Sequence, residues 1–229
     1  MNRKALRWFQ GGILAAFLTI FGFGCGPSLL WFLNRGDEFR DPKPECKLAP
    51  KEGKKTVSVA ILVTAPNSIG SDASMVGIDR DLEGKIAGKI MELSTYSKET
   101  PITVIDSGKV DRLRQENPNY WNTANLSDIA KKLGADYLLD VTVSSLTLYD
   151  QQTGREICRG KATVEVSVYD AVGKGKPLAT YPLSSEAPLR DTSSQPIHVY
   201  RTKFLDGLAM EIAMKHVRYK AELERNLQK

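Results

Sequence analysis

The sequence has few of the residues from which catalytic and metal sites are usually built. It contains two histidines and three cysteines among 229 residues, and none of them shows the spacing of zinc ligands. There is no Gly-x-Ser-x-Gly motif, and neither His198 nor His216 stands near an acid and a nucleophile in the order of a hydrolase triad. We therefore expect no catalytic residues, no metal and no other cofactor, in a protein that is not an enzyme.

A large excess of positive charge is also absent from most of the chain. Lys and Arg number 32 against 27 Asp and Glu, but residues 1–34 hold three of the basic residues and no acidic one. The rest of the chain therefore carries 29 basic and 27 acidic side chains. A nearly neutral domain lacks the basic surface that a nucleic acid requires, so we expect no nucleic-acid partner.

One long uncharged run is present, extending over 23 residues from Gly11 to Leu33. At about 1.5 Å per residue, a helix of this length covers a hydrocarbon core of about 30 Å. Three positive charges precede the run, and the charges that follow it cancel, so the positive-inside rule places the N-terminus in the cytoplasm. Residues 1–34 are predicted to be a membrane anchor or signal segment that contacts the lipid bilayer through residues 11–33, with the domain facing the periplasm.

A second interpretation of this segment is a lipoprotein signal peptide that is cleaved before Cys25. The small residues Gly24 and Gly26 flank this cysteine, but the apolar run continues beyond it, whereas lipoproteins normally turn polar there. Simple cleavage is a third alternative. An uncleaved anchor favours the inner membrane, and a lipidated Cys25 favours the outer membrane.

Residues 35–55 are rich in proline and charge and show no apolar periodicity, which predicts a semi-extended linker. If Cys25 is in the membrane or lipidated, Cys46 and Cys158 are the remaining pair in an oxidising compartment. They are a candidate disulfide that would fasten the linker to the domain. The alternative is two unrelated thiols, with Cys158 half-buried on a strand.

Residues 56–229 are predicted to form one periplasmic α+β domain. The apolar patterns give the order β-α-β-α-β-β-β-α, which implies a mixed sheet with its helices packed on one face. Strands are expected over 56–63, 102–105, 135–150, 156–171 and 178–184, and helices over 78–93, 109–116, 127–133 and 198–227. The apolar positions shift by one residue at Ser144–Ser145, which predicts a β-bulge there.

The polar stretch 117–125 is predicted to be a loop that carries two adjacent aromatic residues, Tyr120 and Trp121. Exposed aromatic side chains bury much area on binding, so this loop is a candidate interaction site. The alternative is that both side chains fold back and cover the end of the sheet.

Two segments resemble known envelope proteins. The run IAKKLGADYLL over 129–139 and the segment VYDA over 168–171 are similar to the periplasmic domain shared by the curli secretion-channel family and the N-terminal domain of TolB. The resemblance covers about residues 56–184. It implies the fold and an envelope location, and it brings no catalytic residues.

The resemblance also defines the functional alternatives. The leading hypothesis is a non-enzymatic assembly or interaction module of the cell envelope, with other envelope proteins or a second copy as partner. A second is an oligomeric secretion or channel subunit; channel-forming members insert long hairpins into the membrane, whereas the long hairpin here, 138–169, belongs to the predicted core sheet. An envelope ligand-binding protein or hydrolase is a third.

Overall fold

The computed structural model describes residues 38–66, 75–97, 101–150, 157–187, 190–191 and 196–227. Apart from Glu38, these residues belong to one compact unit, Phe39–Lys229. The predicted membrane segment and Cys25 lie outside the described residues. Among the helices that are described, none combines the length and the apolar character needed to cross a membrane.

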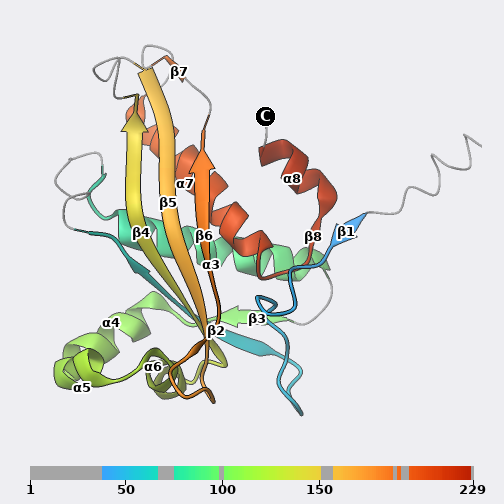
Figure 1. Ribbon diagram of the computed structural model, residues 1–229, viewed down its shortest axis with the longest axis vertical. Coiled ribbons are helices and arrows are strands. Elements are labelled where there is room, and N and C mark those ends of the chain that lie inside the picture. The colour runs from blue at the N-terminus through green and yellow to red at the C-terminus, as the bar shows by residue number, and fades with distance from the viewer. Residues whose placement is uncertain are drawn as a thin grey trace, which may run out of the picture. The chain divides into compact units, whose positions relative to one another are not determined.

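The centre of the unit is a mixed β-sheet with the strand order β3-β2-β4-β5-β6 (Figure 1). Strand β2 is parallel to both β3 and β4, because helical connections carry the chain back to the start of each strand. Strands β4, β5 and β6 form an antiparallel meander, and the short β7 pairs with β5. The strands are β2 (Val57–Thr64), β3 (Ile102–Val104), β4 (Tyr137–Tyr149), β5 (Ile157–Asp170), β6 (Pro177–Glu186) and β7 (Arg190–Asp191).

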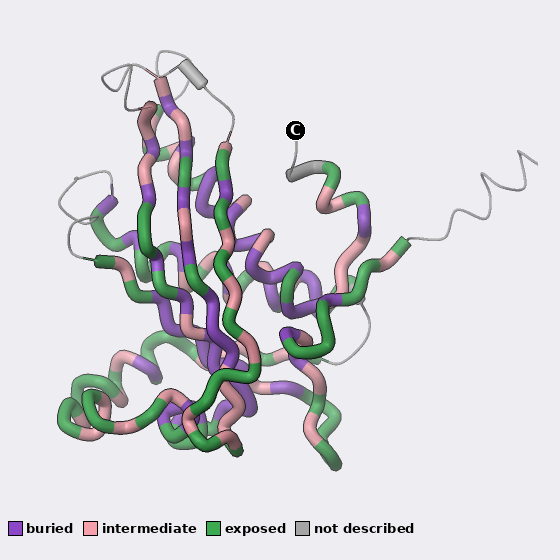
Figure 2. The backbone as a smooth tube through the Cα atoms, viewed as in Figure 1, coloured by how far each residue is buried: buried purple, intermediate pink, exposed green. Residues whose placement is uncertain are grey.

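The predicted arrangement of helices on one face is wrong, because helices cover both faces of the sheet. On one face, α3 (Ile78–Ser97) and α7 (Ile197–Met214) pack against the larger apolar cluster, which includes Val59, Leu139 and Val166. The opposite face carries a smaller cluster around Ala60 and Leu138. It is covered by α4 (Ser107–Glu116), α5 (Pro118–Thr123) and α6 (Leu126–Leu133). The alternating burial that produces two apolar faces is visible along the strands in Figure 2.

Two predicted local features are confirmed. The register of β4 shifts between Val143 and Ser145, where the sequence predicted a bulge. Helix α6 ends at Leu133, where the predicted helix ends, and its C-cap Gly134 has a φ of 74°, in the left-handed region that favours glycine. The N-cap of α6 is Asn125, whose side chain accepts a hydrogen bond from the backbone of Asp128.

The C-terminal helix is shorter than predicted. Helix α7 ends at Met214, and the chain turns into β8 (Tyr219–Lys220) and then α8 (Ala221–Leu227). Strand β8 pairs antiparallel with β1 (Phe39–Arg40), so the start and the end of the unit lie side by side (Figure 1). The charged tail therefore continues the fold as a second, two-stranded sheet with a short helix.

The structure also differs from the predicted linker. Residues 39–48, which we call the strap, lie on the domain, and Cys46 and Leu48 are buried there. The backbone N–H of Leu48 donates to the carbonyl of His216 at 3.1 Å. This segment is rich in proline and charge and has no apolar periodicity, so the sequence pattern could not predict that it packs on the domain.

Candidate functional site

Strand β6 forms the long edge of the main sheet, and the three-residue β3 forms the other edge. Nine of the ten residues of β6 pair with β5, and no second neighbour pairs with it among the residues that the structure describes. Exposed and half-buried residues alternate along it: Ala179, Tyr181 and Leu183 pack on the larger cluster, while Thr180, Pro182 and Ser184 are exposed. A long unpaired edge can accept an additional strand.

The hydrogen-bonding phase of β6 shows which backbone groups face outward. The N–H of Ala187 donates to the carbonyl of Gly160 at 2.8 Å, so this pair bonds across the ladder. Bonded and non-bonded pairs alternate in an antiparallel ladder, and Pro182 pairs with Glu165 at a non-bonded position. The backbone groups of Thr180, Pro182 and Ser184 therefore face the free edge. Proline at this position removes one outward donor without weakening the bonds to β5.

A buried polar cluster joins β6 to the strap. His216 is fully buried; its Nδ1 lies 2.9 Å from the carbonyl oxygen of Cys46, and its Nε2 lies 2.8 Å from the hydroxyl of Tyr181. Burial lowers the pKa of His216 to about 4, partly offset by the hydrogen bond to Cys46. Burial, followed by the neighbouring Cys46, raises the pKa of Tyr181 far above its ordinary range. Both rings are therefore neutral at neutral pH.

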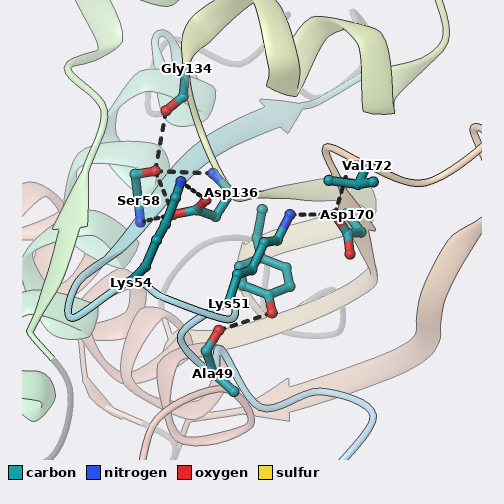
Figure 3. A network of polar contacts seen from close by, with 9 residues as sticks. Ala49, Lys51, Lys54, Ser58, Gly134, Asp136, Asp170 and Val172 are labelled. Atoms are coloured by element: carbon teal, nitrogen blue, oxygen red, sulfur yellow. Dashed lines mark hydrogen bonds and ion pairs between the residues drawn. The ribbon is translucent and has the colours of Figure 1, made fainter.

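A second polar network holds the chain just before β2 (Figure 3). The carboxylate of Asp136 accepts hydrogen bonds from Lys54 Nζ at 2.5 Å and from the backbone and hydroxyl of Ser58 at 2.9 and 2.8 Å. Burial alone would raise the pKa of Asp136, but the hydrogen bonds from Lys54 and Ser58 outweigh it and lower the pKa. Every bond in this network fixes the path of the chain, so we interpret it as structural.

The neighbouring contacts have the same effect. Lys51 Nζ pairs with Asp170 at 2.5 Å and lies 5.2 Å from the centre of the Tyr137 ring. The Tyr137 hydroxyl donates to the carbonyl of Ala49 at 2.9 Å. Figure 3 shows Ala49 and Lys51 on the segment that leads from the strap to β2, with Lys51 reaching Asp170 at the end of β5. The chain is thus fastened both at His216 and at the start of the sheet.

The aromatic pair predicted as an interaction loop lies on α5, which replaces most of the expected loop. Tyr120 and Trp121 are half-buried against the smaller apolar cluster. Lys132 lies 4.2 Å from the centre of the Tyr120 ring, and Arg114 lies 4.7 Å from the centre of the Trp121 ring. These contacts favour the covering role over partner binding, although a partner contact at this pair stays a prediction.

The structure differs from the candidate disulfide between Cys46 and Cys158, because the two cysteines lie in different places and are not bonded. Cys46 is beside His216 and Tyr181, and Tyr181 pairs with Val166 on β5. Cys158 lies eight residues from Val166 along β5, a separation of about 26 Å at 3.3 Å per residue. Bonded cysteines need Cα atoms within about 7 Å.

Few groups in the described part of the chain could perform catalysis or hold a metal. In the part of the chain that the structure describes, no group of three His, Cys, Asp or Glu side chains could hold a metal ion. Glu83 on α3 is the most perturbed carboxyl: burial, Asp111 and Asp79 raise its pKa to about 7, while Arg114 and Arg80 oppose the shift. Its charged neighbours among the described residues are thus two carboxylates and two guanidinium groups. The open β6 edge is thus the stronger candidate.

Comparison with known proteins found distant structural likenesses. No family model matches the chain, and no match was found among curated proteins. A dodecameric PelC variant from Paraburkholderia phytofirmans is 10% identical over 76% of this chain and 96% of its own, with a TM-score of 0.40. A DUF330 protein from Xanthomonas campestris is 9% identical over 82% and 94%, with a TM-score of 0.43.

A lipoprotein from Neisseria meningitidis is 14% identical over 69% of this chain and 99% of its own, with a TM-score of 0.39. TM-scores below 0.5 leave the family and the function of this chain unassigned. The resemblance to the curli secretion-channel family and TolB therefore stays a prediction from the sequence.

Proposed function

We propose that this chain is a membrane-tethered protein of the cell envelope whose domain acts as a non-enzymatic interaction module and binds its partner by strand addition at β6. The open edge of β6 is the observation that supports this proposal. Main-chain hydrogen bonds to an added strand supply affinity, and the alternating side chains supply selectivity. The predicted N-terminal segment keeps the domain at the envelope membrane, facing the periplasm.

The second candidate, a channel subunit of the curli type, would need a hairpin that is free to enter a membrane barrel. The long β4–β5 hairpin is instead covered on one side by α7. Leu146 and Leu148 are buried in the larger cluster, and the Gly160 N–H donates to the Tyr200 hydroxyl at 2.6 Å. A hairpin packed in this way is part of the core, which favours the interaction module.

A single backbone donor provides the sharpest test of the proposal. Thr180→Pro removes an outward-facing N–H, whereas Thr180→Ala keeps it and makes a similar change to the side chain. Both variants of the full chain would be expressed in its native host with a photo-crosslinking residue at Ser184. We expect a specific cross-linked product with Thr180→Ala and at least a tenfold loss of it with Thr180→Pro, at unchanged melting temperature.

The mass of the product identifies the partner. An adduct of twice the chain mass indicates a second copy and favours the oligomeric alternative, while any other discrete mass indicates a different envelope protein. A matched cross-linker at Thr95, exposed on α3, controls for random collisions. Equal yields from Ser184 and Thr95, or equal yields from the two Thr180 variants, would show that β6 is not the docking edge.

A further inference from the structure

His216 connects three parts of the molecule that are distant in sequence. Its Nδ1 contacts the Cys46 carbonyl on the strap, its Nε2 contacts the Tyr181 hydroxyl on β6, and its own carbonyl accepts from Leu48. The ring lies in the turn between α7 and β8, and β8 pairs with β1 at the start of the strap. Separation of the strap from the domain must therefore break the contacts of this ring.

The partners of the ring determine its protonation state. A backbone carbonyl only accepts hydrogen bonds, so Nδ1 carries the hydrogen and donates to Cys46. Nε2 of the neutral ring therefore accepts from the Tyr181 hydroxyl. A proton added to Nε2 would turn this nitrogen into a donor, so the Tyr181 hydroxyl would have to rotate and accept, and its hydrogen would lose its present acceptor.

Burial lowers the pKa of His216, the hydrogen bond to the Cys46 carbonyl partly opposes this shift, and no ionised side chain among the described residues contributes to it. On the strap, the titratable neighbours are Cys46, Lys43 and Glu45; β6 contributes Tyr181; and Lys215 precedes the ring on its own segment. Among the described residues, none of the hydrogen bonds to the ring comes from a carboxylate. A buried cation without a paired anion is costly, so the attached strap requires the neutral ring.

We propose that His216 is an acid-sensitive latch: protonation of its ring favours detachment of the strap, residues 39–48, from the domain. In the detached state the ring is in water and takes up a proton readily, whereas in the attached state it cannot. Acid therefore shifts the equilibrium towards detachment by mass action on the proton. The remaining strap contacts, which include the ion pair between Arg40 and Glu224, decide how often detachment occurs at neutral pH.

The size of the effect follows from the two protonation constants. The ring in water has an ordinary pKa of 6.5, and the buried ring has a pKa of about 4. Between pH 7.5 and pH 5.0, the ratio of detached to attached strap is then expected to rise about 30-fold. The effect saturates below about pH 4, where both states are protonated.

Detachment would change the reach of the domain, and this consequence rests on the proposed membrane tether. Ten residues released from the surface add up to about 34 Å of extended chain between the membrane segment and the sheet. The release would also uncover Tyr181 beside the proposed docking edge. The latch itself depends on neither the tether nor the docking function, so its test is separate from theirs.

Hydrogen exchange of the full chain in detergent tests the latch. After correction for the intrinsic effect of pH, strap amides are expected to exchange about 30-fold faster at pH 5.0 than at pH 7.5, while amides of β2 stay protected. The variant His216→Asn keeps a donor towards Cys46 but cannot titrate, so its strap should show less than a threefold change. The latch is wrong if wild-type strap exchange changes by less than threefold, or if the variant responds as the wild type does.

Two further readings complete the test. If β2 amides lose protection in proportion to the strap and at the same rate, acid unfolds the whole domain and no separate latch exists. If His216→Asn does not fold, the His216 ring is followed by NMR in the wild-type chain. A titration midpoint below pH 5 in the attached state supports the latch, and a midpoint near 6.5 contradicts it.

Discussion

At the scale of the residue, Gly160 on β5 is packed closely against α7. A Cβ atom at this position would lie 2.6 Å from the ring of Phe204 on α7, closer than real atoms approach. The Gly160 N–H also donates to Tyr200 on the same helix. Glycine is needed here because it allows α7 to lie directly on the strand.

We therefore expect Gly160→Ala to destabilise the domain by about 1–3 kcal/mol, as overpacking commonly does. Chemical denaturation followed by circular dichroism measures the change. Gly88→Ala is the matched control, because a Cβ there meets nothing within 4 Å on an exposed helical face. That variant should be stabilised by up to about 1 kcal/mol. A Gly160→Ala domain as stable as the wild type would show that α7 moves freely.

At the scale of the element, α6 depends on how it ends. The N–H of Gly134 donates to the carbonyl of Lys131 and the N–H of Ala135 donates to that of Ala130, so two carbonyls of the last turn are satisfied. Both bonds require the left-handed backbone of Gly134, and no neighbouring atom lies where its Cβ would be. The penalty for another residue is therefore purely conformational.

Gly134→Ala is expected to lower the free energy of unfolding by about 1 kcal/mol. Gly134→Asn should lose less, because asparagine tolerates this conformation better. Equilibrium urea unfolding of both variants measures the difference. Equal stability of the alanine variant and the wild type would contradict the strain argument.

The sequence was most informative where local chemistry determines an element. The β-branched run of β2, the Ser144–Ser145 shift and the Gly134 cap predict a strand, a bulge and a helix end because each depends on its own residues. The failures concern contacts between distant residues. Strand β4 has two apolar faces because Leu138 packs in the smaller cluster and Leu139 in the larger one. No residue near Cys46 in the sequence indicates that His216 packs against it.

The candidate site divides in the same way. A final strand was predicted over 178–184, but its position at the edge depends on the order of all the strands. The sequence shows Tyr120 and Trp121 as an adjacent aromatic pair. Whether they pack inward from α5 depends on the smaller apolar cluster, which distant residues form. The sequence around His216 shows neither metal ligands nor triad partners. Its partner on the strap is the backbone carbonyl of Cys46, and a backbone contact of this kind cannot be predicted from residue types.

At the scale of the whole molecule, the form of the N-terminus distinguishes the two membranes that the proposed tether allows. We expect the intact mass of the chain, extracted from its native membrane without reducing agent, to equal the full 25.3 kDa chain. A cleaved chain that begins at a diacylglycerol-modified Cys25 would instead show a lipoprotein. Cys25→Ala should leave the first mass almost unchanged and abolish the second.

The pairing of β1 with β8 has a consequence for the order of folding. These strands join residues near 40 and 220, so this contact closes a loop that contains almost the whole domain. Closing such a loop has a high entropic cost until the intervening sheet and helices have formed. We therefore expect the strap to dock last, after the sheet and the C-terminal segment have formed, so that a domain that is still folding has its longest free N-terminal segment.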